Sequence, residues 1–312
     1  MHFHFHDVYK KWGAKFSPAI LKEAKLMPEN LTLERAALHA EWQQKTIKDD
    51  PIFGTVMTNP ELCAELLRRA LPELTIKWVK DADPQHTIQA TPTAKGIRID
   101  VYARDNQNRT YTIKMQMVNE HNLPFRMREY QELMDQEILN SGDDYDKLAN
   151  YPTYVIFFCN FDYYHRGLAR YQFEFREKWH PEIAAGDLRT LVVFNTKAKD
   201  YQHAAEIRPF LDMIRGTVDT KDKFVAAVDA EVQAIRADKQ REARFMKEQI
   251  ELRRQLRKSE EAGRDKTVLN MIKSLESQGI PKAQVVKTIA IAESLSAEEA
   301  QKYYEQLLVT EQ

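Results

Sequence analysis

Residues 153–161 carry the sequence TYVIFFCNF, which is a nearly uninterrupted apolar run. A strand with one face in water alternates apolar and polar side chains, whereas a strand covered on both faces is apolar throughout. The run therefore predicts a strand that is buried on both faces. The sequence TLVVFN predicts a further strand at 190–195, and a helix is expected after it at 202–215.

Two segments before this strand alternate between apolar and polar residues: 96–103 (GIRIDVYA) and 109–117 (RTYTIKMQM). Alternation on both sides of the turn-forming sequence DNQN predicts a β-hairpin. If the apolar residues of both strands share one face, Asp100 and Lys114 share the other. Asp100 lies opposite Lys114 only if the hairpin loop has three residues, 106–108, because a loop of two residues would turn Asp100 to the wrong face.

Helices are predicted on either side of the hairpin. Asn59 is a favourable N-cap, Pro60 suits the first helical position and Glu61 lies in the first turn, so a helix is expected at 60–71. Apolar residues at helical spacing predict another helix at 124–140.

The other N-terminal segments have weaker patterns. Residues 74–79 (LTIKWV) alternate and predict a strand, whereas the polar segment 80–95 predicts a loop. An N-terminal extension is expected to contain helices at 18–26 and 32–45.

The C-terminal third is different in character. Residues 219–262 contain no proline or glycine, are densely charged and carry a loose apolar stripe, which is typical of one or two long helices or a coiled coil. Gly263 is expected to end this segment, and short helices are predicted at 266–278, 281–292 and 296–309. We expect the long helices to assemble the chain into a homo-oligomer.

These patterns divide the chain into four parts. They are a helical N-terminal extension at 1–44, an α/β domain at 45–215, a long helical or coiled-coil stalk at 216–262 and a small helical domain at 263–312.

Composition sets limits on the class of protein. The 46 Lys and Arg residues balance 47 Asp and Glu residues, so any nucleic-acid-binding surface must be local. The only cysteines, Cys63 and Cys159, have no disulfide or metal-site pattern and are expected to be reduced thiols. No apolar run reaches the roughly 18 residues of a membrane helix, and the first residues lack the apolar core of a signal peptide. We therefore expect a cytoplasmic protein without a membrane partner.

The hairpin also carries a motif, an Asp in its first strand and a Lys-x-Gln triplet in its second. Further motifs follow in a set order: DPIFGTVM at 50–57, NPELC at 59–63, RMREYQ at 126–131, GDDY at 142–145, PTYVIFFCNFD at 152–162 and FNT at 194–196. Over residues 48–198, this set resembles the recombination-promoting nuclease/putative transposase family of the PD-(D/E)xK superfamily. The resemblance implies an α/β fold: a restriction-endonuclease-like mixed sheet flanked by helices, followed by an all-α C-terminal region.

The resemblance also implies a Mg²⁺- or Mn²⁺-dependent DNA endonuclease. Hard divalent cations prefer carboxylate oxygens, and Asp100 matches the first metal ligand of the family. Gln116 matches the position at which the wider superfamily has a lysine that orients the attacking water. Glu61, or Glu65 on the same helix, is a candidate for an additional metal-binding acid. The candidates for DNA phosphate contacts lie on the following helix, namely Arg126 and Arg128.

Lys114 departs from the family pattern, which has an acid at this position of the catalytic set. An ammonium has no lone pair for a metal and repels one. Three readings stay open: the site is inactive as written, an acid such as Glu120 or Glu61 replaces the lost ligand, or the strands pair differently. The expected function is accordingly a DNA endonuclease of the recombination-promoting or transposase type, impaired by Lys114. The alternative is a catalytically silent DNA-binding or interaction protein on the same scaffold.

If the strands pair as predicted, Asp100 should form an internal ion pair with Lys114. The cation should then favour the charged form of the carboxyl group.

Overall fold

The computed structural model describes residues 29–84, 87–88 and 97–309. The expected helix at 18–26 lies outside these residues. The chain forms two compact units, which are described separately below. One is His39–Glu242; the other combines the described residues up to Leu38 with those from Ala243 onward.

The larger unit is built on a six-stranded mixed sheet with the strand order β1-β4-β5-β6-β8-β7. Strands β5, β6 and β8 are parallel, whereas β1, β4 and β7 pair antiparallel with their neighbours. The strands are β1 (Val79–Pro84), β4 (Val101–Asp105), β5 (Thr110–Gln116), β6 (Thr153–Cys159), β7 (Arg170–Phe173) and β8 (Arg189–Asn195). A separate antiparallel pair joins β2 (Thr87–Ile88) to β3 (Ile97–Arg98).

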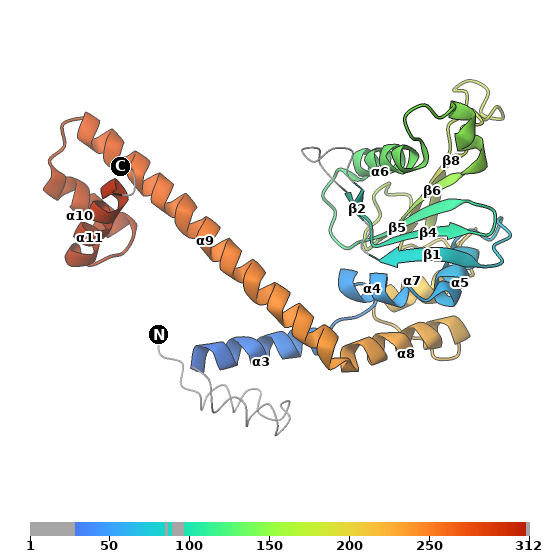
Figure 1. The fold of residues 1–312 in the computed structure, drawn as a ribbon, viewed down its shortest axis with the longest axis horizontal. Helices are drawn as coiled ribbons and strands as arrows, with labels where there is room; N and C mark the ends of the chain where they lie inside the picture. The colour runs from blue at the N-terminus through green and yellow to red at the C-terminus, as the bar shows by residue number, and fades with distance from the viewer. Residues whose placement is uncertain (1–28, 85–86, 89–96, 310–312) are drawn as a thin grey trace. The chain divides into compact units, whose positions relative to one another are not determined.

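Helices cover both faces of this sheet, as Figure 1 shows. Helix α6 lies on one face, and α4, α5, α7 and α8 lie on the other. Their bounds are α4 (Asp50–Val56), α5 (Pro60–Ala70), α6 (Leu123–Ile138), α7 (Arg208–Ile214) and α8 (Lys223–Ala237). A 3₁₀ helix, η2 (Tyr145–Asn150), precedes β6. The expected mixed sheet flanked by helices is confirmed.

Strand β6 is buried on both faces, as its apolar run predicts. On one face Phe157 meets Tyr130 of α6 in an edge-on ring contact. On the other face Phe158 stacks on Phe194 of β8 and meets Phe210 of α7. Each burial contributes on the order of 2 kcal/mol of hydrophobic free energy, so this strand anchors both helical layers to the sheet.

The sequence locates the two principal helices to within two residues. Helix α5 begins at Pro60, where the side chain of Asn59 accepts hydrogen bonds from the backbone N–H groups of Glu61 and Leu62. Such a cap is worth about 1 kcal/mol. Helix α6 starts at Leu123 and ends at Ile138, so its ends differ by one and two residues from the expected 124–140.

The prediction of a strand at 74–79 is wrong, because strand β1 starts only at Val79. The prediction of a loop from residue 80 is wrong for the same reason. The backbone groups of the residues before β1 form hydrogen bonds with side chains. The carbonyl of Ile76 accepts from Arg68 (2.9 Å), that of Thr75 accepts from Arg109 (2.7 Å), and the Lys77 N–H donates to an asparagine side chain. The backbone groups of this segment therefore bond to side chains rather than to a neighbouring strand.

The first hairpin strand is also interrupted. Its early part, β3, pairs with β2, and its later part, β4, pairs with β1 and β5, with a bend at Asp100 between them. The carboxylate of Asp100 accepts the Met115 N–H at 2.7 Å. A side chain therefore binds this backbone group of the partner strand, which is consistent with the break in the strand.

Helices α8, α9 (Lys239–Ser277), α10 (Lys282–Ala292) and α11 (Ala297–Val309) follow the sheet. The expectation that Gly263 ends the long helix is wrong, because α9 continues through it. A single glycine costs a helix only about 1 kcal/mol. The intact hydrogen-bond ladder and the C-terminal core that includes Val268 and Ile272 are sufficient to offset this cost.

Helix α8 packs within the larger unit, although the sequence analysis assigned it to the stalk. Asp222 caps α8 through the Val225 N–H and pairs with Arg69 of α5 at 2.7 Å. The ring of Phe224 contacts Phe210. The unit that contains the sheet therefore extends to Glu242, past the expected boundary at 215.

The C-terminal helices form a small core of their own. The packed residues come from α9, α10 and α11: Val268, Ile272, Val285, Val286, Ile289, Ala300, Tyr304 and Leu307. Across the described residues, none of the helices has the length and apolar character that crossing a membrane requires.

Candidate nuclease-like site

The hairpin of β4 and β5 brings Asp100 beside Lys114. Val101 pairs with Ile113, and Arg104 pairs with Thr110. In each pair the two residue numbers add up to 214, as they do for Asp100 and Lys114. The strands therefore have the register that places Asp100 opposite Lys114, as the sequence analysis predicted. The predicted three-residue loop is confirmed, because the Asp105 N–H bonds to the Arg109 carbonyl.

The turn owes its conformation to Asp105, which is fully buried. Its carboxylate accepts the backbone N–H groups of Gln107 (2.8 Å) and Arg109 (3.0 Å), the Arg109 guanidinium (2.6 Å) and the Tyr111 hydroxyl (2.8 Å). Asn108 adopts the left-handed backbone region that this loop needs, with φ of 60°. These bonds hold the register that positions the site.

Asp100 is fully buried, and both of its carboxylate oxygens have donors. Oδ1 accepts from the Lys114 ammonium, and Oδ2 accepts from the Met115 N–H at 2.7 Å. The Lys114 side chain is 13% exposed. The expected internal ion pair between Asp100 and Lys114 is therefore present.

Burial raises the pKa of Asp100 to about 6. The charge and hydrogen bond of Lys114 oppose this rise, whereas the charge of Asp50 adds to it. Lys114 thus favours the charged form of the carboxyl group, as expected, but burial has the larger effect, so the pKa of Asp100 lies above its ordinary value of 3.8. Removal from water outweighs the nearby cation.

Asp50, which the sequence analysis placed only in the DPIFGTVM motif, acts on the charge of this site. It begins α4, and its Oδ1 atom is buried and lacks a hydrogen-bond partner within the described part of the chain. The neighbouring Asp49 makes the local turn instead, accepting the Thr46 N–H at 2.7 Å. The adjacent acids Asp49 and Asp50 could have indicated this role in the sequence, because the turn before the helix needs only one of the two carboxylates.

Gln116 and Arg126 form a second contact beside the ion pair. The Arg126 guanidinium donates to Oε1 of Gln116, and the Gln116 amide donates to the Val118 carbonyl at 2.7 Å. Arg126 also lies over the ring of Phe157, 5.8 Å from its centre, and 3.6 Å from a Glu120 oxygen. The hairpin and the first turn of α6 are thus joined by one guanidinium.

Tyr130 connects the two contacts electrostatically. Burial raises the pKa of its hydroxyl, and Asp100 adds to the rise, whereas Lys114 and Arg126 lower that pKa. The site therefore combines Asp50, Asp100, Lys114, Gln116, Arg126 and Tyr130.

The remaining candidates lie in other surroundings. Glu61 is exposed in the first turn of α5, where the helix dipole favours an acid. Glu65 pairs with Arg68 and Arg69 on the same helix. Glu120 is mostly exposed and lies near Arg126, and Arg128 is exposed on α6.

The donor set does not fit a divalent cation. Asp50 and Asp100 offer carboxylates, but the third group is the ammonium of Lys114, which repels a cation. Within residues 29–84, 87–88 and 97–309, no three His, Cys, Asp or Glu side chains are grouped to hold a metal ion.

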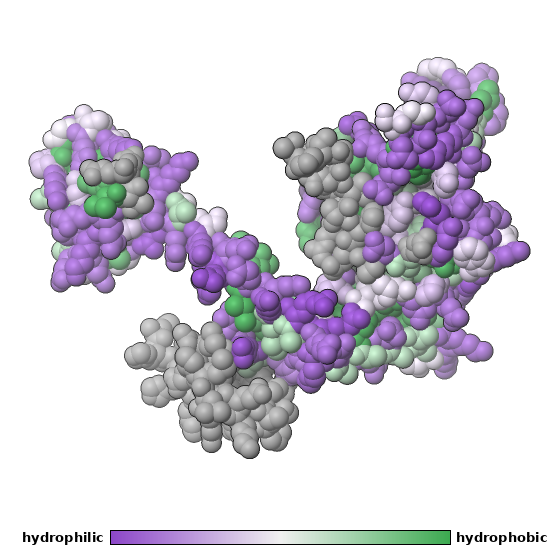
Figure 2. All heavy atoms as spheres, in the orientation of Figure 1, coloured by the Kyte–Doolittle hydropathy of each residue, from purple (hydrophilic) through white to green (hydrophobic). Residues whose placement is uncertain are grey.

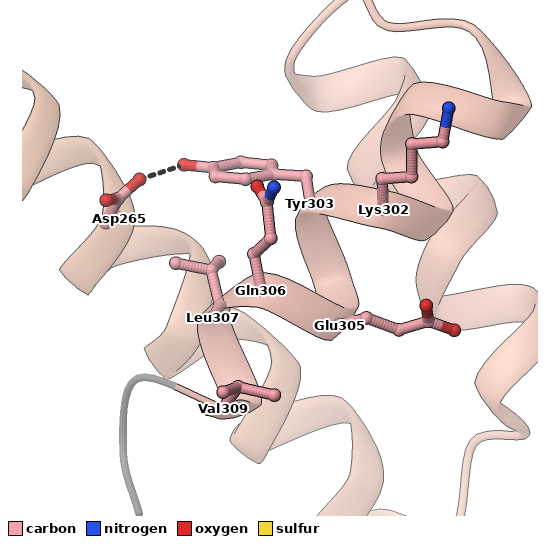
Figure 3. A pocket seen from close by; sticks show the side chains of 7 residues that line it. All are labelled: Asp265, Lys302, Tyr303, Glu305, Gln306, Leu307 and Val309. Carbon is pink, nitrogen blue, oxygen red and sulfur yellow. Dashed lines mark hydrogen bonds between the residues drawn. The ribbon is translucent and has the colours of Figure 1, made fainter.

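A separate hollow lies in the C-terminal unit, with a volume of about 630 Å³. Figure 3 shows Tyr303 of α11 reaching Asp265 of α9, and their hydrogen bond measures 2.5 Å. The hollow is lined by side chains of mixed character, Asp265, Lys302, Tyr303, Glu305, Gln306, Leu307 and Val309.

A mixed sheet with an acid, a lysine and a glutamine at the end of a central hairpin defines a nuclease-like α/β protein. A model of the PD-(D/E)XK nuclease family transposases matches residues 51–274, well over half of the chain. The chain belongs to this family, which confirms the resemblance. No curated protein and no solved structure matches it.

Proposed function

We propose that this chain is a DNA endonuclease of the recombination-promoting or transposase type whose metal-dependent cleavage is impaired by Lys114. The supporting observation is the buried Lys114–Asp100 ion pair. Membership of the family supports a nuclease-like function and DNA as substrate.

The charges explain why Lys114 matters. Two unit charges about 4 Å apart interact by about 4 kcal/mol at an effective dielectric constant near 20, and a divalent cation doubles this. A metal ion at Asp100 would have to displace the Lys114 ammonium from a largely buried position. It would gain one carboxylate and face a repulsive cation, so its affinity should be low.

We place the DNA contacts of this unit at Arg126 and Arg128. Arg126 is held by Gln116 at the edge of the site, and Arg128 is exposed two residues further along α6. Guanidinium groups suit phosphate recognition, and these contacts need no metal. DNA binding is therefore expected to persist where cleavage is absent.

The test compares the parent chain with Lys114→Glu, which restores an acid, and with Lys114→Glu combined with Asp100→Ala. Calorimetric titration with Mg²⁺ and Mn²⁺ and supercoiled-plasmid nicking are measured for each. We expect metal binding and nicking only in Lys114→Glu. Lys287→Glu, an exposed residue of α10 with the same charge change, is the matched control.

Metal-dependent nicking by the parent chain would contradict the proposed impairment. It would indicate that a different acid, such as Glu120 or Glu61, replaces the lost metal ligand. If Lys114→Glu binds metal and DNA without cleaving, the alternative of a silent DNA-binding protein replaces the endonuclease. That alternative is supported by Asp100, because both of its oxygens already have donors within the protein.

A further inference from the structure

Helix α9 carries a local concentration of positive charge. Residues 244–258 contain six Lys and Arg residues against two Glu residues, a net charge of +4 in a chain whose net charge is −1. All of these residues belong to the unit formed with the C-terminal helices. Figure 2 shows a largely hydrophilic surface along this helix.

Five of these cations share one side of the helix. Arg244, Lys247, Arg254 and Lys258 are separated by three, seven and four residues, spacings close to whole turns of 3.6 residues. Arg257 follows Arg254 by three residues and borders the same side. We call these five residues the basic face of α9. Arg253 points elsewhere and pairs with Glu34 at 3.7 Å.

The basic face is exposed, and its charges have no ion-pair partner among the described residues. All five side chains are exposed, and in the part of the chain that the structure describes no carboxylate forms an ion pair with any of them. The nearby Glu251 accepts from Gln255 at 3.2 Å instead. The positive charge is therefore available to a partner.

We propose that the basic face of α9 binds the phosphate backbone of double-stranded DNA, as a contact surface separate from the hairpin site. This inference rests on the proposed function for its choice of DNA. Arg244 and Lys258 are about 21 Å apart along the helix axis. B-DNA carries about twelve phosphate charges over that length, so several cations can contact phosphates at once without reading the base sequence.

A lipid surface fits this helix less well. A helix lying in a membrane interface needs a continuous apolar face. The exposed large apolar residues of the same stretch are Leu252 and Leu256, and the next residues along that side are Ser259 and Gly263. Two leucines are too small an apolar face to hold the helix on lipid.

The test is binding of a fluorescent 30-base-pair duplex to the full chain at several salt concentrations without divalent cations. The variant is Arg254→Gln, Arg257→Gln and Lys258→Gln, which keeps good helix formers. The control removes three exposed lysines from α10 and α11: Lys282→Gln, Lys287→Gln and Lys302→Gln. A charge-conserving variant, Arg254→Lys with Arg257→Lys, tests whether charge alone suffices.

We expect the basic-face variant to bind at least about tenfold more weakly near 0.15 M salt, and its slope of log affinity against log salt to fall by about 2 to 3. The control and charge-conserving variants should bind like the parent. Equal losses in the basic-face and control variants would overturn the proposal, as would no loss or preferential binding to anionic vesicles. Plasmid nicking by Lys114→Glu is scored separately, so failure of the endonuclease proposal is distinguishable.

Discussion

Lys114 and Asp100 form a buried ion pair across two antiparallel strands, and the N–H of Met115 binds the remaining carboxylate oxygen. The ammonium of Lys114 therefore supplies the positive charge beside this carboxylate from within the protein. We propose that a divalent cation binds there only when residue 114 is an acid. The following predictions test what this ion pair does in the protein.

Lys114→Met should destabilise the fold in a pH-dependent way. Lys114 lowers the pKa of Asp100, so its loss should raise that pKa further above about 6, whereas the ordinary value is 3.8. When folding raises the pKa of an acid, the folded protein becomes less stable as the pH rises through that raised pKa. We expect a loss of about 3 kcal/mol at pH 7.5, typical of breaking a buried pair. The loss should be smaller at pH 5, where Asp100 is largely protonated. Urea unfolding at both pH values measures it.

The control for this experiment is Lys114→Met combined with Asp100→Asn. Without a titrating carboxyl group at position 100, the difference between the two pH values should shrink to that of unrelated groups. A loss in Lys114→Met that is equal at both pH values would assign the effect to packing instead of charge.

Asp50 should act as the third carboxylate once Lys114 becomes an acid. Its charge already raises the pKa of Asp100, and its Oδ1 atom is buried without a partner in the described residues. In the Lys114→Glu background, Asp50→Asn should weaken Mn²⁺ binding at least about tenfold, or about 1.4 kcal/mol. Glu61→Gln is the comparison, since Glu61 is exposed on α5. Titration calorimetry that shows the larger loss for Glu61→Gln would assign the helix acid to Glu61.

Asp105→Ala should reduce stability by about 3 to 5 kcal/mol, because it leaves a buried guanidinium without its carboxylate. Asp105 is fully buried, and Arg109 nearly so. Chemical denaturation measures the loss. The matched variant is Asp143→Ala, which removes an ion pair with Lys147 that is about one-third exposed on both sides. That loss should be much smaller, because an exposed ion pair contributes little to stability. Similar losses in the two variants would contradict the role given to the turn.

The hairpin register was predictable from the sequence, because alternation assigns faces and loop length assigns partners. The placement of Asp100 beside Lys114 follows from these two local rules. The contribution of Asp50 does not, since it depends on how α4 packs in the tertiary structure. The raised pKa of Asp100 was not predictable for a related reason: the sequence reveals a cation nearby but not the loss of water around the carboxyl group.

The C-terminal region shows the same division between local and tertiary information. Dense charge and the absence of proline predict helices, and α8 and α9 are helical. The sequence does not reveal that Phe224 packs on Phe210, which ties α8 to the sheet-containing unit. Gly263 lowers local helix propensity, yet the continuing backbone ladder and the packing beyond it are stronger than one glycine.

The last prediction concerns the proposed homo-oligomer. Leu252 and Leu256 of α9 are 48% and 54% exposed and lie one turn apart, on the side of the helix away from the basic face. If a second copy covers them, Leu252→Gln with Leu256→Gln should lower the mass found by light scattering to that of the 36.5 kDa monomer. Removing everything after residue 216 would be a poor test, because α8 packs within the sheet-containing unit. Ile291→Gln, at an exposed apolar residue of α10, is the control and should leave the mass unchanged. A monomeric parent chain, or an oligomer that survives the double substitution, would rule out assembly through this side of α9.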